Sequence, residues 1–536
     1  MPRPCFATWT RLVLAVVAAQ CLNTVNARSM VGRDFIFAYA ENYRPNADPT
    51  VIITNMSPLD HELVTVTVST PVHGVLRTVT LRGFHSSAQV TLPREVVPVG
   101  PDPETVAVVV EADDDVTVHA LNDAHDKSMD GFAVLPLPAL GREYYAATFT
   151  PSLRAQIVIV TTAPSTTIRI HLADSLMYKS REVPAGNTIL IEAGAREAFL
   201  LSGNKDLTGT RITSDKPVAV LTGNRCAFVP VGVVSCDHLV EMLPPFGQWG
   251  TGFVLMPFLG RSAGAVYRVV AGRAGTEVTT GSRSITLDRA GDFAEYRLPD
   301  GRAEFVRASR PVMVMQFSLG YAADGSDGDP SMAVVPPVEQ RAPSAVLVTY
   351  NATKGLGAVQ NYVNVYAACA ELHYGNLTLD GRVIRDIVTE PRILRAGRSE
   401  YCAVGLHLTH GTHVLAPLAS ASGGAGTETF VGLAYGFAQA NSYAWPVAMA
   451  TDDLTCRYER PEGGTADYDC SKALFIEEIP CNHTFETMEP CLVDECVPNE
   501  YVIFICAGVA AAAIILQNLF VRCVIRKHSL PKSQIR

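Results

Sequence analysis

Asp237, His238 and Glu241 are the residues whose types and spacing could most directly support acid–base or metal chemistry. A histidine beside a carboxylate can relay a proton, and both groups are ordinary ligands of zinc. In a β-strand, however, neighbouring side chains point to opposite faces, so three ligands could not converge from one short segment. We therefore predict a structural role for this segment and assign no catalytic, cofactor-binding or metal-binding residue.

Two other sets of ionisable residues lie at expected turns, namely His407, His410 and His413, and Asp324, Asp327 and Asp329. A two-residue turn at the middle histidine would keep the three rings apart. The aspartates alternate with glycine as calcium tolerates, but the full calcium-loop pattern with a distal bidentate glutamate is absent, so we expect a solvated loop. The ectodomain sequence also lacks the nucleophile elbow, the zincin motif and the phosphate loop, so we predict that the protein is not an enzyme.

Nine cysteines of the expected ectodomain should be largely paired in an oxidising compartment. They are Cys226, Cys236, Cys369, Cys402, Cys456, Cys470, Cys481, Cys491 and Cys496. We predict two local disulfides, Cys226–Cys236 and Cys369–Cys402, while the last five cysteines crowd into a stalk over residues 451–500. Because nine is odd, at least one cysteine is free or bonds to another chain. The second alternative would give a disulfide-linked homo-oligomer.

Four asparagines match the pattern that accepts N-linked glycans, namely Asn351, Asn376, Asn482 and Asn55. The match at Asn55 is weakened by Pro58, which follows the acceptor triplet. A glycan needs a surface position, so we expect these asparagines to be exposed.

The two ends of the chain carry apolar segments of different kinds. Residues 1–27 combine basic residues, an apolar stretch and small residues, which predicts a signal peptide. Residues 501–521 contain no charge and are long enough to cross a hydrocarbon core of about 30 Å as one helix. Basic residues follow in a short tail, 522–536, so we expect a single-pass type I protein of the plasma membrane with an extracellular N-terminus.

Composition supports folded, extracellular β-modules. Of 536 residues, 48% are hydrophobic and 18% are charged, which supplies sizeable cores and argues against disorder. The formal net charge of −10 makes nucleic acid an unsuitable partner. Alternation in runs such as Thr65–Val68 and Thr167–Ile170 predicts strands with one buried face, so the ectodomain should be all-β.

A strand recurs about every 100 residues, centred on Val116, Val218, Val312 and Val414. Each copy is followed by a proline-marked segment, which indicates one unit used four times. We expect tandem β-sandwich-like modules over 28–140, 141–248, 249–341 and 342–450. A propeller-like closed ring is the alternative, since closure also protects strand edges.

The second expected module carries a specific pattern. It runs through Ser214–Val220, Gly223, Cys226, Cys236–Pro245 and Trp249. This pattern resembles the IgG-Fc-binding domain family of secreted, mucus-associated and surface proteins, and the resemblance extends more loosely over residues 32–446. It implies an extracellular, non-enzymatic recognition module.

These observations favour a cell-surface protein whose β-modules recognise an extracellular protein or glycan without cofactors. Two alternatives come from other functional classes. One is an ectoenzyme acting on glycans, which would gather two carboxylates in one cleft. The other is a structural or adhesion protein that contacts copies of itself.

Overall fold

The computed structural model describes residues 30–454 apart from 58–62, 126, 351–357, 375–376, 389–392, 419–428 and 453. This part is all-β, as predicted, with two short α-helices, α2 (Cys369–Tyr374) and α3 (Ile384–Ile387), among its described residues. No helix described here has the length and apolar character needed to span a membrane. The expected signal peptide, stalk, span 501–521 and tail lie outside the described residues.

Module 1 is the set of strands β1–β7. They are β1 (Gly32–Phe37), β2 (Asp48–Asn55), β3 (Leu63–Thr70), β4 (Gly74–Arg82), β5 (Ser87–Thr91), β6 (Val108–Asp123) and β7 (Met129–Val134). The long strand β6 organises this sheet, whose order is β4-β3-β6-β2-β5. Its first part pairs with β1 and β3, and its second part pairs with β2 and β7.

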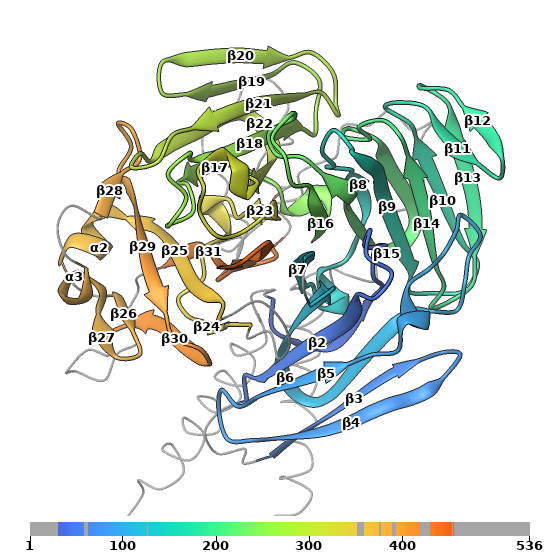
Figure 1. The fold of residues 1–536 in the computed structure, drawn as a ribbon, viewed down its shortest axis with the longest axis horizontal. Helices are drawn as coiled ribbons and strands as arrows, with labels where there is room; N and C mark the ends of the chain where they lie inside the picture. The colour runs from blue at the N-terminus through green and yellow to red at the C-terminus, as the bar shows by residue number, and fades with distance from the viewer. Residues whose placement is uncertain are drawn as a thin grey trace, which may run out of the picture. The chain divides into compact units, whose positions relative to one another are not determined.

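Module 2 and module 3 have the same strand order around their own long strands. Module 2 contains β8 (Gly141–Tyr145), β9 (Leu153–Thr161), β10 (Thr166–His171), β11 (Leu176–Tyr178), β12 (Arg181–Val183), β13 (Thr188–Ala193), β14 (Ala198–Gly203), β15 (Arg211–Ala227) and β16 (Asp237–Met242). Module 3 contains β17 (Gly250–Leu255), β18 (Ala265–Ala271), β19 (Thr276–Thr280), β20 (Arg283–Leu287), β21 (Phe293–Leu298), β22 (Glu304–Phe317) and β23 (Met332–Val335). Figure 1 labels most strands of each sheet.

Module 4 departs from this order because two strands stand where the other modules have one long strand. Its elements are β24 (Ala345–Val348), β25 (Gln360–Ala368), β26 (Leu377–Leu379), β27 (Arg382–Val383), β28 (Ile393–Arg395), β29 (Tyr401–Leu408), β30 (Thr412–Pro417), β31 (Phe430–Ala438) and β32 (Asn441–Val447). β30 pairs with β24 and β26, whereas β31 pairs with β25 and β32.

The split strand changes the register expected for the fourth module. Equivalent positions on the long strands are shown by their cross-strand partners, Gly32 for Val116, Gly141 for Val218 and Gly250 for Val312. The matching bridge in module 4 joins Ala342 to Phe430, whereas Val414 lies before the split and pairs with Val346. Assigning Val414 to this series was therefore wrong, because residues 419–428 separate the two parts of the strand.

The three glycines of this series lie directly against prolines. The pairs are Gly32 with Pro136, Gly141 with Pro245, and Gly250 with Pro337. A Cβ added to these glycines would come within 2.6, 2.4 and 2.4 Å of the proline Cβ, closer than two carbons can pack. The proline-marked segments of modules 1 to 3 therefore pack directly against these glycines.

The last strands of the modules lie together. β16 packs against β7 and β23, and β32 packs against the same two strands, so their contacts close on themselves. Hydrophobic clusters also cross module boundaries: Val266 and Val270 of β18 belong to the cluster that contains Ile157 and Ile159 of β9. The modules therefore share their cores instead of folding around separate ones.

Candidate binding surface around the disulfide-stapled loop

A disulfide joins Cys226 to Cys236 and closes the loop between β15 and β16. A second disulfide joins Cys369, at the start of α2, to Cys402 in β29. Both pairings confirm the prediction from the sequence. The remaining five candidates, Cys456, Cys470, Cys481, Cys491 and Cys496, lie outside the described residues.

The stapled loop is also tied to module 3. The Gly320 N–H donates to the Val229 carbonyl over 2.8 Å, and the Ser235 hydroxyl donates to Asp329 Oδ2 over 2.8 Å. A Cβ at Gly320 would lie 3.0 Å from the Ser235 carbonyl oxygen, which shows how closely the two loops approach. The loop is therefore held by a covalent link at its base and by neighbouring backbone along its length.

Large apolar side chains nevertheless face solvent on this rigid loop. Val231 is 64% exposed, Val234 is 69% exposed, and Tyr321 of the adjoining loop is 46% exposed. We call these three residues the stapled-loop patch. Apolar side chains held in water by a fixed backbone favour association with another apolar surface.

Asp237, His238 and Glu241 lie beneath the loop and are fully buried. Their side chains bind different partners: His238 Nδ1 contacts the Asn224 carbonyl over 3.0 Å, while Glu241 Oε2 accepts the Val334 N–H over 3.0 Å. Among the described residues no three metal-ligating side chains are placed to hold an ion. These residues join strands and are closed to a substrate.

Burial sets the protonation of this segment. It raises the pKa of Asp237 well above its usual range, with the Asp329 carboxylate adding to the effect. Burial also raises the pKa of Glu241 and lowers that of His238 to about 4. All three groups thus favour their neutral forms, as expected where charge cannot be solvated.

Replacing Asp237 with asparagine should stabilise the protein, and increasingly so as pH rises. An acid whose pKa is raised by folding stabilises the fold most below its unfolded pKa, and this contribution is lost as pH rises through the folded pKa. The asparagine amide has nearly the same shape as the Asp237 carboxyl group and does not ionise, so the stability of the variant lacks this pH dependence. The midpoint of thermal unfolding, compared between wild type and Asp237→Asn from pH 4.5 to 8, should show a gap that widens with pH; a constant gap would contradict this account.

Asp130 in β7 is a buried carboxylate that sequence reasoning missed. Its Oδ2 accepts the N–H of Val240 in β16 and of Met332 in β23, each over 3.1 Å. The backbone of Ala444 in β32 also stabilises its charged form, although burial raises its pKa overall. One side chain therefore binds the backbone of three other modules.

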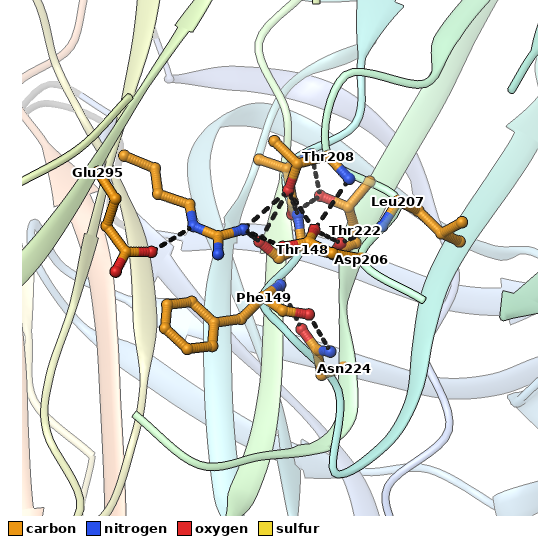
Figure 2. Close-up of polar contacts among 10 residues, drawn as sticks. Thr148, Phe149, Asp206, Leu207, Thr208, Thr222, Asn224 and Glu295 are labelled. Atoms are coloured by element: carbon orange, nitrogen blue, oxygen red, sulfur yellow. Dashed lines mark hydrogen bonds and ion pairs between the residues drawn. The ribbon is translucent and has the colours of Figure 1, made fainter. Parts of the chain in front are cut away.

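Arg268 in β18 is a second missed residue, and it joins module 3 to module 2 behind the stapled loop. Its Nη1 donates to Asp206 Oδ2 over 2.6 Å and to the Thr148 carbonyl over 2.7 Å, and its Nε donates to Glu295 over 3.0 Å. Figure 2 shows Thr148, Asp206 and Glu295 around this guanidinium. The Phe149 ring lies 4.4 Å from it, in a cation–π contact.

The strand that leads into the stapled loop is fixed to the same cluster. Asn224 of β15 accepts the Phe149 N–H over 2.7 Å and donates to the Phe149 carbonyl over 2.9 Å. Thr222 donates to the Ala147 carbonyl over 2.7 Å. Figure 2 shows Asn224 facing the Phe149 backbone. Since Arg268 of module 3 contacts the Phe149 ring, Phe149 links the strand before the stapled loop to module 3.

The aspartate loop expected to be solvated is partly buried instead. Asp324 forms two hydrogen bonds of 3.1 Å with Arg261, whose side chain has no exposed surface. Asp329 is buried and accepts from Ser235, whereas Asp327 is exposed. The expectation of a solvated loop was thus wrong for Asp324 and Asp329, because Arg261 and the stapled loop cover them.

The three histidines of the hairpin bind separate partners. His413 Nδ1 lies 2.7 Å from Asp380 Oδ2, His407 Nε2 lies 3.2 Å from Gln360 Oε1, and His410 contacts Thr349. The rings do not form one site.

Asn55 is unsuited to a glycan in the folded chain. Its side chain is fully buried, its amide donates to the Gly83 carbonyl over 2.8 Å, and its Oδ1 accepts the Ser57 N–H over 2.8 Å. The expected exposure at this position was therefore wrong, because Asn55 holds the end of β2. Asn351, Asn376 and Asn482 lie outside the described residues.

Residues 130–436 match the family described as IgGFc binding protein. A human protein named IgGFc-binding protein is 26% identical to the chain over 371 residues, which are 67% of this chain and 6% of that protein. The chain thus spans a small fraction of this relative.

Solved structures give only faint likenesses. One is the BSP domain of a biofilm-associated protein, 11% identical, covering 60% of this chain and 70% of that one with a TM-score of 0.12. Another is trypsin-activated alpha-2-macroglobulin from Escherichia coli, 10% identical, covering 78% and 41% with a TM-score of 0.13. Scores of this size carry no argument about fold or function.

Proposed function

The chain belongs to the IgGFc-binding protein family, and from that premise we propose that residues 30–454 form a recognition head that binds an extracellular protein through the stapled-loop patch. The immunoglobulin G Fc region is the ligand class we propose, following the name of the human relative. No covalent chemistry is part of this function.

The exposure of Val231 and Val234 on a doubly fixed loop is the observation that carries the proposal. A flexible loop would lose conformational freedom on binding, and this cost would reduce affinity. The disulfide and the contacts of Val229 and Ser235 with module 3 remove much of that cost beforehand. Apolar anchors on a preorganised surface are typical of the residues that dominate protein interfaces.

The arrangement of the modules supports a rigid head. We propose that the four modules are copies of one unit closed into a ring, instead of a line of separate sandwiches. The support is the shared strand order of modules 1–3 and the cyclic contacts of β7, β16, β23 and β32. We call β7, β16, β23 and β32 the inner strands. In a ring, the loops at one end of these inner strands lie on the same face of the head.

The cellular setting remains part of the proposal. We place this head outside the cell, anchored by residues 501–521, with glycans at Asn351, Asn376 and Asn482 and a stalk whose odd cysteine could join two chains. The support is the charge pattern, the acceptor triplets and the odd number of ectodomain cysteines.

Introducing charge into the stapled-loop patch should abolish this binding. Surface plasmon resonance with immobilised IgG Fc would compare the wild type with a Val231→Asp/Val234→Asp variant. We expect at least a hundredfold loss of affinity, since two apolar anchors at about 1.4 kcal/mol or more each correspond to two factors of ten. The matched control is Val75→Asp, because Val75 is 64% exposed on β4 of module 1.

The outcomes separate the parts of the proposal. Equal binding by wild type and the double variant would place the surface elsewhere. Absence of Fc binding by the wild type would refute the proposed ligand. Loss of binding by Val75→Asp as well would show that the effect is not specific to the loop.

A further inference from the structure

A cavity of about 320 Å³ opens at one end of module 3, among strand ends and the turns that follow β19 and β21. This volume falls within the roughly 300–1,000 Å³ that small-ligand sites occupy. The residues that matter for its chemistry are Tyr267, Tyr296, Arg283, Arg302 and Glu304. None of them belongs to the stapled-loop patch.

Tyr267 and Tyr296 are direct cross-strand partners on β18 and β21. The register of the long strands gives the equivalent pair in each other module. All three are aliphatic: Val51 with Val90, Ile157 with Leu201, and Val363 with Leu406. Module 3 therefore has a pair of tyrosines, with two hydroxyl groups, where the other three modules have a pair of aliphatic side chains.

Neither tyrosine hydroxyl has a hydrogen-bond partner among the described residues, although both are buried. Tyr267 is fully buried. A buried hydroxyl without a partner is costly, and phenylalanine would fill the same space without that cost. Such a pair beside a cavity points to a ligand that supplies the missing hydrogen bonds.

The charges around the cavity favour an anion. Arg302 and Glu304 form an ion pair of 2.8 Å, so the carboxylate is already compensated. Arg283 forms no ion pair with any described residue. Arg297 follows Tyr296 in β21 and pairs with Val266, so its side chain belongs to the other face of the sheet. Arg283 also acts on Tyr296, since burial raises the pKa of Tyr296 and the Arg283 charge opposes that rise.

We propose that this cavity binds an acidic sugar residue, a hydroxylated ring that carries one carboxylate. The two tyrosine hydroxyls would bond the ring hydroxyls, and the uncompensated Arg283 would bind the carboxylate, as planar guanidinium groups do. Leu255, Leu298 and Pro299 of the cavity wall offer apolar surface to the carbon face of the ring. A neutral sugar would leave Arg283 unpaired, so the site discriminates by charge.

The test uses the purified full chain and isothermal titration calorimetry with three probes. These are methyl β-glucuronide, the methyl glycoside of N-acetylneuraminic acid, and methyl β-glucoside as the neutral comparison. We expect saturable binding of at least one acidic probe, with the neutral glucoside bound at least tenfold more weakly. The two acidic probes distinguish a uronic acid from a sialic acid as the source of the carboxylate.

Variants then assign the contacts. Tyr267→Phe, Tyr296→Phe and Arg283→Gln should each weaken acidic-sugar binding about tenfold, the value of one hydrogen bond or charge-assisted contact. Arg77→Gln is the matched control, since Arg77 is an exposed arginine on β4, the module 1 counterpart of β20. The phenylalanine variants should keep or raise the thermal midpoint, which separates lost binding from lost folding.

Three results would overturn the site. They are no saturable binding of either acidic probe by the wild type, equal binding of the neutral glucoside, and unchanged affinity in all three variants. Because the Fc measurement uses a different surface, failure of either proposal leaves the other standing.

Discussion

The Asp130→Ala variant is expected to lose about 3–5 kcal/mol of unfolding free energy, because each buried N–H left without a partner costs about 1–3 kcal/mol. The N–H groups of Val240 and Met332 would both be orphaned, since both donate to the same carboxylate oxygen. Ala444 would lose the same acceptor. Urea denaturation followed by tryptophan fluorescence would measure the change.

The matched variant is Asp130→Asn, which keeps one oxygen acceptor and the shape of the side chain. It should lose less than the alanine variant, because an amide oxygen in the place of Oδ2 can still accept from Val240 and Met332, and the Gly131 N–H would then face the NH2 group. Similar losses in the two variants would contradict the assigned role. So would an alanine variant within about 1 kcal/mol of wild type, the range of an ordinary surface substitution.

The strands could be predicted from the sequence because the alternation of apolar and polar residues within a strand is a local pattern. The runs Thr65–Val68 and Thr167–Ile170 lie in β3 and β10, and their alternation reports one buried face. The two disulfides could be predicted because each pair is close along the chain, ten and 33 residues apart. Local information was sufficient for these features.

The central carboxylate could not be found in this way. Asp130 precedes Gly131, a pair typical of turns, and its partners lie 110 and 202 residues away. The repeat itself offered a signal, because aligning Val116 with Val218 sets Asp130 level with Leu239 on the equivalent inner strand. A carboxylate that stands level with the buried Leu239 of the next module indicates a buried acceptor.

The same comparison reveals the tyrosine pair of module 3. Tyr267 and Tyr296 read as ordinary strand residues, since tyrosine is common in strands. They stand out only when the cross-strand pairs of the four modules are compared, because the other three modules have aliphatic pairs at the equivalent position. The fourth register was misread through Val414, although the glycine- and serine-rich sequence between Pro417 and Phe430 is a local signal for a break between two strands.

Replacing Arg268 is expected to separate modules 2 and 3. Its side chain is 3% exposed, and its charge lowers the pKa of Asp206 although burial acts in the opposite direction. Removing one partner of a buried ion pair leaves the other charge uncompensated, which typically costs 3–5 kcal/mol, and we expect about that loss in unfolding free energy for Arg268→Ala. Arg77→Ala is the control for losing an exposed arginine.

A double-mutant cycle tests whether the ion pair itself is responsible. Arg268→Met fills the space between Phe149 and Phe293 without a charge, and Asp206→Asn removes the charge that Arg268 compensates. The double variant should be more stable than the sum of the single losses predicts, because no buried charge is left unpaired. Additive losses would show that Arg268 acts through packing alone. Since Asn224 and Phe149 connect this cluster to the stapled loop, the Arg268→Met variant should also bind Fc more weakly than Arg77→Ala does.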